Sequence, residues 1–289
     1  MSFPVELLAP PDPAVLPLPH PAFPAPGVRL LRGAVYGVPD GGRPLELDLW
    51  LPEEAAEPLP VVVFVHGGAW RTGLRDDPGP RFRAWRPGPF ARLAAAGFAV
   101  ACPGYRLSGE ARHPAQRDDV AAALAWLRTR AGELGLDPGR TVLWGESAGG
   151  HVAALTALTR PAGVVGCVTW YAPAELDTTA TDPGTFEARM LGAAPAADPA
   201  RARDASPVAH VTPQAPPFLL LHGAGDTIIP CDQSVRLATA LRQAGVPAEL
   251  HLVEQADHLW VGADEAAVEE CFARTLAFAA ARAHLGPRP

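Results

Sequence analysis

Lysine and asparagine are both absent from this sequence, so all 24 basic residues are arginines. Together with the abundance of alanine and proline, these absences indicate a compositional bias of the source genome rather than a functional adaptation. Positive charge is also in the minority, because 31 acidic residues give the chain a formal net charge of -7. We therefore do not expect binding to nucleic acid or to an anionic membrane surface.

Cysteine is scarce, and long apolar runs are missing. The four cysteines show neither paired spacing nor a C-x-x-C motif, so we expect buried, reduced thiols. No run approaches the roughly 18 apolar residues that a membrane-spanning helix needs. The first residues carry no positive charge, and prolines interrupt the apolar stretch that follows, unlike a secretory signal peptide. These absences predict a cytoplasmic protein without a membrane span.

The most informative motif is G-x-S-x-G, found as Gly145-Glu146-Ser147-Ala148-Gly149. An apolar run over residues 141–144 predicts a strand before it, and the residues from Gly150 onward predict a helix after it. A serine between a strand and a helix in this motif is typical of the nucleophile elbow of α/β-hydrolases, a tight turn at unfavourable backbone angles. We therefore predict Ser147 as a nucleophile.

A loop that binds an oxyanion is predicted upstream of this motif. Residues 61–65 have the pattern of a fully buried strand, which leads into His66-Gly67-Gly68-Ala69-Trp70. In such an HGG loop, backbone N–H groups turn toward the negative charge that develops on a substrate carbonyl, and each donor typically contributes about 3 kcal/mol. We assign Gly67, Gly68 and Ala148 as the donors.

The acid and the base are expected on two later loops, each after a predicted strand. Asp226 follows the apolar run 217–221, and His258 follows residues 248–253, which alternate apolar and polar side chains. A serine hydroxyl needs such a base, oriented by an acid, before it can act as a nucleophile. The chain order Ser147, Asp226, His258 is the order of α/β-hydrolases.

Three other carboxylates compete with Asp226 for the role of the acid. Glu254 and Asp257 lie too near His258 along the chain to reach its imidazole from a separate strand end, and Asp232 is better placed to cap the following helix. No pair of histidines with carboxylates has the spacing of metal ligands, so a metal site is not expected.

Strand and helix patterns alternate along most of the chain. They predict an α/β-hydrolase fold with a mostly parallel eight-stranded sheet and helices on both faces. We expect residues 1–27, which are rich in proline, to form an irregular arm and residues 28–284 to form the hydrolase domain. Within that domain, residues 171–216 break the alternation and predict a small lid inserted over the site.

Pocket residues are predicted from their position beside the catalytic loops. Trp70, Ile228 and Trp260 each adjoin one of these loops, and packing at the rim is an equally open interpretation. In the lid, Phe186 and Met190 are candidates to face a substrate, with the alternative that they hold the lid to the domain.

With these residues in place, the chain resembles the esterase branch of α/β-hydrolases that includes hormone-sensitive-lipase-like and feruloyl- and acetyl-xylan-esterase-like enzymes. The resemblance covers most of residues 45–280 and rests on both glycine motifs, on Tyr105-Arg106-Leu107 with Asp119, and on the loops of the acid and the base. It implies that Ser147, Asp226 and His258 hydrolyse small short-chain acyl or aryl carboxylic esters without a cofactor. One departure is Ala69, where many relatives carry a third glycine.

Other functions stay open. Trp70 after the HGG loop also resembles arylformamidases, which cleave an N-formyl amide with the same residues, and acyl transfer would use them as well. A catalytically inactive hydrolase fold that only binds small molecules would be expected to lack the nucleophile or the base, and both are present. The expected partner is a small-molecule ester, and the oligomeric state is left open, with a homodimer among the candidates.

Overall fold

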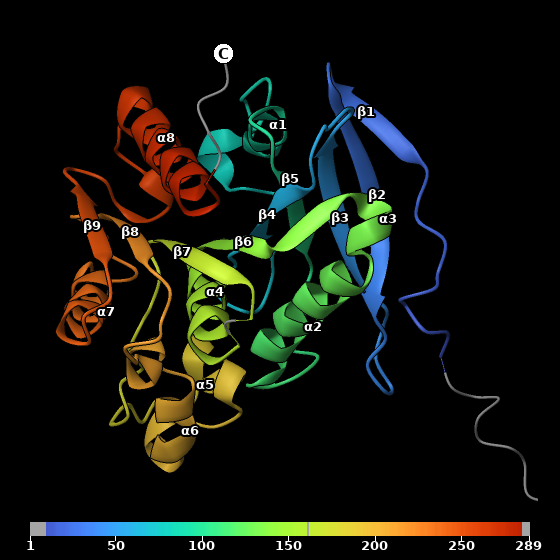
Figure 1. The fold of residues 1–289 in the computed structure, drawn as a ribbon. Coiled ribbons are helices and arrows are strands. Elements are labelled where there is room, and N and C mark those ends of the chain that lie inside the picture. The colour runs from blue at the N-terminus through green and yellow to red at the C-terminus, as the bar shows by residue number, and fades with distance from the viewer. Residues whose placement is uncertain (1–9, 161, 285–289) are drawn as a thin grey trace, which may run out of the picture.

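Nine strands form one sheet within the part of the chain that the computed structural model describes, residues 10–160 and 162–284. The strands follow the order β1-β2-β3-β5-β4-β6-β7-β8-β9 across the sheet (Figure 1). The pairs from β1 to β5 are antiparallel, and the pairs from β5 to β9 are parallel. The strand bounds are β1 Pro21–Ala25, β2 Val28–Gly37, β3 Leu45–Pro52, β4 Leu59–Val65, β5 Ala99–Pro103, β6 Leu136–Glu146, β7 Val164–Trp170, β8 Phe218–Gly223 and β9 Ala248–Val253.

The sheet has one strand more than the eight that the sequence predicts. The additional strand is β1, which pairs antiparallel with β2 and so shortens the predicted irregular arm. Prolines at both Pro21 and Pro24 hide this strand in the sequence, because proline lacks an N–H and is tolerated only at the edge of a sheet. Residues 1–9 of the predicted arm lie outside the described residues.

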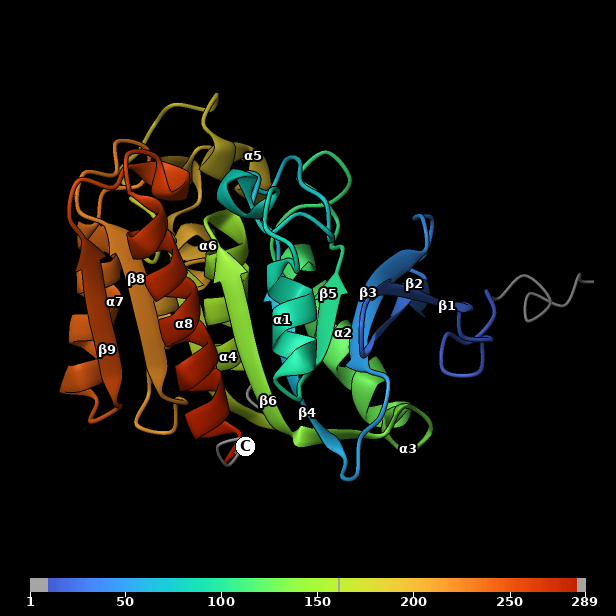
Figure 2. The same cartoon turned by 90° about the horizontal axis from the view of Figure 1, so that it is seen from above.

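Helices cover both faces of the sheet, as expected for the predicted fold. Figure 2 shows α1 and α8 together on one face, while α2, α4 and α7 pack on the other. Alternate residues of the buried strand β4 enter the two cores, with Val63 on the side of α4 and Phe64 on the side of α8. The helix bounds are α1 Pro89–Ala95, α2 Ala115–Thr129, α3 Ala131–Leu134, α4 Ala148–Thr159, α7 Asp232–Gln243 and α8 Glu265–Arg282.

The segment between β7 and β8 corresponds to the predicted insertion over residues 171–216. It contains the short helices α5 (Phe186–Leu191) and α6 (Pro199–Asp204), with 3₁₀ turns at Pro195–Ala197 and Pro207–His210. In Figure 1 these helices lie together beneath α4. Further 3₁₀ turns cover Pro80–Phe82 and His258–Trp260. No helix among the described residues has the length and apolar character that crossing a bilayer requires.

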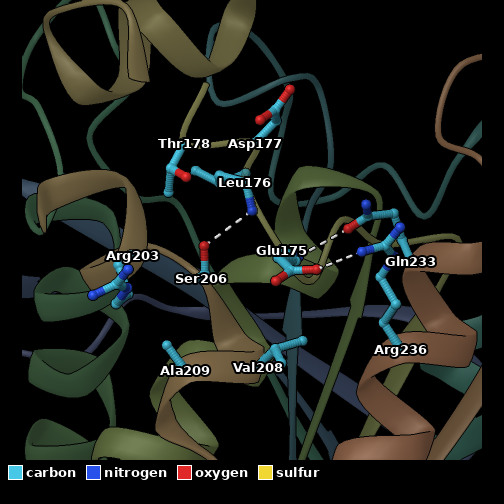
Figure 3. Close-up of a pocket in the computed structure, with 10 residues that line it drawn as sticks. All are labelled: Glu175, Leu176, Asp177, Thr178, Arg203, Ser206, Val208, Ala209, Gln233 and Arg236. Atoms are coloured by element: carbon cyan, nitrogen blue, oxygen red, sulfur yellow. Dashed lines mark hydrogen bonds and ion pairs between the residues drawn. The ribbon is translucent and has the colours of Figure 1, made fainter. Parts of the chain in front are cut away.

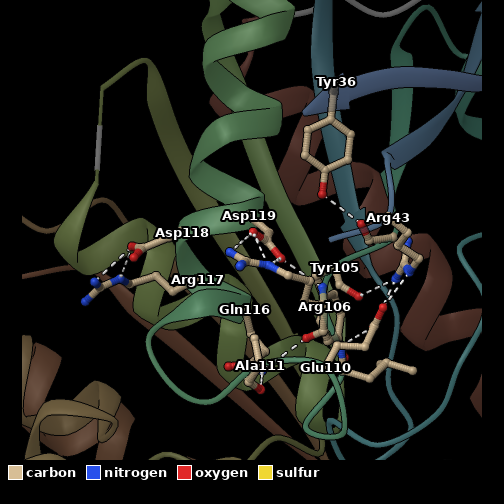
Figure 4. Close-up of polar contacts among 12 residues, drawn as sticks. Tyr36, Arg43, Tyr105, Arg106, Glu110, Ala111, Gln116, Arg117, Asp118 and Asp119 are labelled. Atoms are coloured by element: carbon tan, nitrogen blue, oxygen red, sulfur yellow. Dashed lines mark hydrogen bonds and ion pairs between the residues drawn. The ribbon is translucent and has the colours of Figure 1, made fainter. Parts of the chain in front are cut away.

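A polar network fixes the loop between β5 and α2 (Figure 4). The guanidinium of Arg106 donates two hydrogen bonds at 2.6 and 2.9 Å to the buried carboxylate of Asp119, which also accepts from the Arg106 N–H. Gln116 donates to the carbonyls of Arg106 and Ala111. The motif residues Tyr105-Arg106 and Asp119 therefore have a structural role, because they hold this loop beside the HGG loop.

Candidate active site

Ser147 lies between the end of β6 and the first turn of α4. Its backbone angles, φ 50° and ψ -126°, lie outside the regions that non-glycine residues favour, as expected for a tight strand-to-helix turn. The turn also depends on Gly149, because a Cβ there would collide with the carbonyl oxygens of Val65 and His66. Close packing of α4 against the HGG loop therefore requires glycine at this position and holds the serine hydroxyl above the sheet.

The structure brings the three residues predicted as nucleophile, acid and base into one line. Ser147 Oγ is 3.0 Å from His258 Nε2, and His258 Nδ1 is 2.7 Å from Asp226 Oδ2. Because Nδ1–H donates to the carboxylate, Nε2 presents its lone pair to the serine hydroxyl. This is the arrangement in which an imidazole can remove the proton from a serine.

The carboxylate of Asp226 is kept ionised by several donors. Its Oδ1 accepts hydrogen bonds from the N–H groups of Ile228 and Ile229, at 2.9 and 2.7 Å. A second histidine, His222, places Nε2 3.3 Å from Oδ2. Burial by itself would raise the pKa of Asp226, but the hydrogen bonds from His222, His258 and Ile229 outweigh it and hold the pKa well below its usual range.

The contact between His222 and Asp226 was not predicted from the sequence. It is fully buried, and the same Nε2 also lies 2.8 Å from the carbonyl of Ile229, so this nitrogen carries the proton and donates to both oxygens. Nδ1 lies 2.7 Å from Ser234 Oγ. The only sequence signal is the spacing of four residues between His222 and Asp226 in the loop after β8.

The rival acids have other roles in the structure. Asp257 accepts hydrogen bonds from the N–H groups of Thr227 and His258, at 2.7 and 2.6 Å, and so ties the loop of the acid to the loop of the base. Asp232 does not cap α7 with its side chain, since the helix begins at Asp232 itself and the carboxylate pairs with Arg236 at 3.0 Å.

The HGG loop turns sharply, with positive φ at Gly68, Ala69 and Trp70 in succession. Gly68, Ala69 and Ala148 line the cavity above Ser147, but Gly67 does not. The Gly67 N–H instead donates to Glu146 Oε1 at 3.3 Å. The assignment of Gly67 as an oxyanion donor is therefore wrong for this structure, because a buried carboxylate already occupies its N–H.

Glu146 joins the HGG loop to the base. Its carboxyl accepts a hydrogen bond from Tyr171 O–H at 2.7 Å in addition to the one from Gly67, and the Tyr171 ring contacts the His258 ring edge-on at 4.9 Å between centroids. Burial raises the pKa of Glu146, which is only 5% exposed. Sequence reasoning missed this role, because the position between Gly145 and Ser147 is variable in the motif.

The base of the HGG loop is fixed by Tyr105, whose O–H donates to the carbonyl of His66 at 2.9 Å. The His66 ring stacks on Tyr105, with 4.4 Å between centroids, and its Nδ1 lies 2.8 Å from the Gly67 carbonyl. Burial lowers the pKa of His66 to about 4, so the ring stays neutral and serves as packing.

A cavity of about 700 Å³ opens above Ser147. Of the predicted pocket residues, Ile228 and Phe186 line it and are exposed. Trp70 also lines it but is almost fully buried, with Nε1 donating to His151 Nδ1 at 3.2 Å. The remaining lining residues are Gly68, Ala69, Arg71, Thr72, Ser147, Ala148, Pro173, Glu187, Ile229, His258 and Leu259.

Trp260 and Met190 do not line this cavity, so their positions favour the packing interpretation over contact with a substrate. Both are 1% exposed, and Trp260 packs against Tyr171 at 4.8 Å between ring centroids. The 3₁₀ turn at His258–Trp260 has positive φ at Leu259, and Leu259 lines the cavity while Trp260 enters the core. Among the residues that the structure describes, no group of three or more metal-ligating side chains could hold a metal ion.

Comparison with known proteins identifies the family. Residues 47–241 match the family model named BD-FAE, a span that includes the HGG loop, Ser147 and Asp226. The chain belongs to the BD-FAE family. This membership confirms the predicted resemblance to α/β-hydrolase esterases, although His258 lies beyond the matched residues.

Individual relatives of this BD-FAE chain are esterases by name. It is 33% identical to Esterase LipC of Mycobacterium tuberculosis over 220 residues, which are 68% of this chain and 52% of LipC. It is 30% identical to the probable carboxylic ester hydrolase LipM of the same organism over 271 residues, which are 86% of this chain and 61% of LipM. The BD-FAE chain thus spans little more than half the length of these two curated relatives.

Solved structures confirm the fold of this BD-FAE chain. Esterase Est2 of Thermogutta terrifontis, solved with propionate bound, superposes with a TM-score of 0.73 at 25% identity and covers 91% of this chain and 97% of Est2. A truncated carbohydrate esterase from gut microbiota gives a TM-score of 0.73 at 24% identity, covering 88% of this chain and 96% of that one. The predicted α/β-hydrolase architecture is therefore correct.

Proposed function

We propose that this chain is a serine carboxylesterase that hydrolyses small short-chain acyl or aryl esters. The observation that carries the proposal is the hydrogen-bonded chain from Ser147 Oγ through His258 to Asp226. Ser147 and His258 line a cavity of about 700 Å³ that can hold a substrate. The similarity of the protein to Esterase LipC and to Est2 supports an ester as the substrate.

In the first half of the reaction, His258 Nε2 takes the proton of Ser147 as Oγ attacks the carbonyl carbon. The carbonyl π bond opens and leaves an oxyanion, while Asp226 stabilises the positive charge on the imidazole. His258 then gives this proton to the departing alcohol or phenol, and an acyl group remains on Ser147. A water molecule repeats the sequence and releases the carboxylic acid.

The N–H groups of Gly68, Ala69 and Ala148 are the proposed oxyanion donors, because all three residues line the cavity beside Ser147. This set replaces Gly67 by Ala69. A backbone donor at Ala69 explains how alanine functions where many relatives have glycine. Phe186 and Glu187 of α5 line the same cavity, so we infer that the insertion over residues 171–216 covers the acyl or alcohol portion of the substrate.

The test is hydrolysis of p-nitrophenyl esters from acetate to decanoate. Ser147→Ala and His258→Ala should each lower kcat by at least about 10³-fold, since residues of a triad act as a unit. Thr212→Ala, a substitution at an exposed position away from the cavity, is the matched control and should keep native activity. Native turnover that survives in Ser147→Ala would overturn the proposal.

The basis for the formamidase alternative is Trp70, whose indole N–H donates a hydrogen bond to His151 inside the domain. Packing accounts for this tryptophan without an aryl amide substrate. Relative turnover of N-formyl-kynurenine and phenyl acetate separates the two activities, and a faster reaction with the formyl amide would favour the alternative.

A further inference from the structure

A second cavity, of about 400 Å³, adjoins the catalytic cavity and is lined by three arginines and no acidic residue. Arg71 comes from the segment after the HGG loop, Arg112 from the loop between β5 and α2, and Arg189 from α5. Ser108 adds a hydroxyl, and the rest of the wall consists of glycine, alanine and proline residues. Three separate segments thus bring positive charge to one place in a chain whose net charge is -7.

The three guanidinium groups are unpartnered, since no hydrogen bond or ion pair joins Arg71, Arg112 or Arg189 to another side chain among the described residues. Glu110 could have neutralised Arg112 from the same loop. Its carboxylate instead pairs with Arg43 at 2.6 Å and accepts the Leu107 N–H. All three arginines are exposed, so their charge is available to a ligand that enters this cavity.

The position of Arg112 is built into the fold. Its side chain crosses the C-terminal end of α5 directly over Gly192, where a Cβ would collide with the Arg112 side chain. The Arg112 loop is itself fixed, because Gln116 donates to the carbonyl of Ala111 at 2.9 Å and Arg106 is locked to Asp119 (Figure 4). The insertion and the domain therefore meet around this guanidinium.

Another cavity, by contrast, is lined by acidic as well as basic side chains. The cavity in Figure 3, of about 690 Å³, lies between the insertion and α7 and contains both signs of charge. There Arg236 pairs with Glu175 at 2.8 Å, and Asp177 lines the same space as Arg203. Such a mixed lining gives no preference for an anion.

We propose that the cavity of Arg71, Arg112 and Arg189 binds a negatively charged group of the substrate, a carboxylate or a phosphate. The proposal rests on the proposed esterase function. Arg71 lines both cavities, so a substrate with its ester carbonyl at Ser147 can extend past Arg71 and place its anionic end among the three guanidinium groups. Guanidinium forms paired, charge-assisted hydrogen bonds with carboxylate and phosphate oxygens.

Matched esters test this preference on both sides of the bond. For the acyl side, the pair is mono-p-nitrophenyl adipate and p-nitrophenyl hexanoate, and for the alcohol side it is 4-acetoxybenzoate and its methyl ester. We expect the native protein to prefer the anionic member of at least one pair in kcat/KM. The double variant Arg112→Gln/Arg189→Gln should lose about tenfold or more of this preference, with turnover of the neutral member unchanged.

Arg203→Gln is the matched control, because Arg203 is an exposed arginine that lines the mixed cavity instead. Equal kcat/KM for both members of each pair, or a preference that the double variant retains, would overturn the anion site while leaving the esterase proposal intact.

Absence of all ester turnover would instead overturn the proposed function. The anion site would then be tested by thermal melts in inorganic phosphate, with sodium chloride at equal ionic strength as the reference. A rise in Tm with phosphate in the native protein that the double variant lacks supports the site, and an equal response of both proteins overturns it.

Discussion

At the scale of single residues, Asp226 receives more hydrogen bonds than the orientation of one imidazole requires. His222 and His258 both reach Oδ2, and two backbone N–H groups occupy Oδ1. In the proposed reaction a fixed, ionised carboxylate both orients His258 and stabilises the charge that develops on it, so we infer that His222 is a positioning residue for Asp226.

Replacement of His222 by phenylalanine should lower kcat about tenfold while KM stays unchanged, since a hydrogen bond to a charged group contributes about 1.5–3 kcal/mol. Steady-state kinetics with p-nitrophenyl acetate measures this effect. His222→Gln keeps an N–H donor and should recover part of the loss. A native kcat in His222→Phe with an intact fold would show that the contact has no role in catalysis.

Glu146 predicts a pH-dependent change in stability. Burial raises its pKa above the usual 4.5, so the folded state keeps the proton to a higher pH than the unfolded state does. The contribution of Glu146 to stability is therefore largest below pH 4.5 and is lost as the pH rises through the raised pKa. Glutamine does not titrate and can still pair with both Gly67 and Tyr171.

The difference in Tm between Glu146→Gln and the native protein should therefore shift in favour of the variant from pH 5 to pH 8. Thermal melts of both proteins at the two pH values measure this change, with the exposed Glu53→Gln as the control. A difference in Tm that does not vary with pH would contradict the prediction.

At the scale of single residues, the sequence predicts positions most sharply where a local marker exists. The structure brings Ser147, Asp226 and His258 together because each follows a recognisable strand, and parallel strands end at one edge of the sheet. The prediction is weaker for Gly67 and Trp260, whose orientation depends on a few positive φ angles and on the buried carboxyl of Glu146. These are tertiary effects that no local pattern encodes.

At the scale of elements, the proposed acid Asp226 and the proposed base His258 lie on neighbouring loops, after β8 and β9. The Asp257 carboxylate accepts a backbone N–H group from each of the two loops, those of Thr227 and His258. Thr227 Oγ1 lies within 3.1 Å of the same carboxylate. This half-buried side chain therefore adds to the Asp226–His258 bond and to the backbone hydrogen bonds from Ala224 and Gly225 in fixing the relative position of the two loops.

Asp257→Ala should lower kcat by about ten- to a hundredfold, because small misplacements of catalytic groups are costly. The urea midpoint of unfolding should change little. Asp257→Asn retains an oxygen acceptor and should stay close to native, and Asp232→Ala on α7 is the control for loss of a surface carboxylate. Retention of native kcat in Asp257→Ala would show that the loops are positioned without it.

The element pattern itself was largely predictable. Eight of the nine strands follow runs of alternating or continuous apolar residues, and only β1 escaped because prolines interrupt it. The insertion was predicted as a break in the alternation, but its internal helices are too short for periodicity to indicate which side chains meet the cavity, as Met190 shows.

At the scale of the whole molecule, buried neutral histidines should make the fold sensitive to acid. Burial lowers the pKa of His66 to about 4 and that of His151 to about 3. His151 Nδ1 accepts a hydrogen bond from Trp70 while Nε2 lies 2.6 Å from the Ala205 carbonyl, so an added proton would face another donor. The unfolded chain binds protons below pH 6.5, and the folded chain does not until about pH 4 or lower.

The free energy of unfolding should therefore fall as the pH drops from 6.5 toward 4, by up to about 1.4 kcal/mol per pH unit for each histidine. Urea unfolding at pH 7, 6 and 5 measures this slope. His151→Gln removes one titrating group and should flatten it. A midpoint that is constant between pH 7 and pH 5 would contradict the prediction.

The outermost strand has a consequence for how copies of this protein meet. Two of the five residues of β1 are prolines, so this edge offers an interrupted row of donors to an incoming chain and resists edge-to-edge aggregation. At the opposite edge of the described sheet, β9 contains no proline. In concentrated solution, strand addition between molecules should therefore begin at β9, and a proline introduced on its outer side would suppress it.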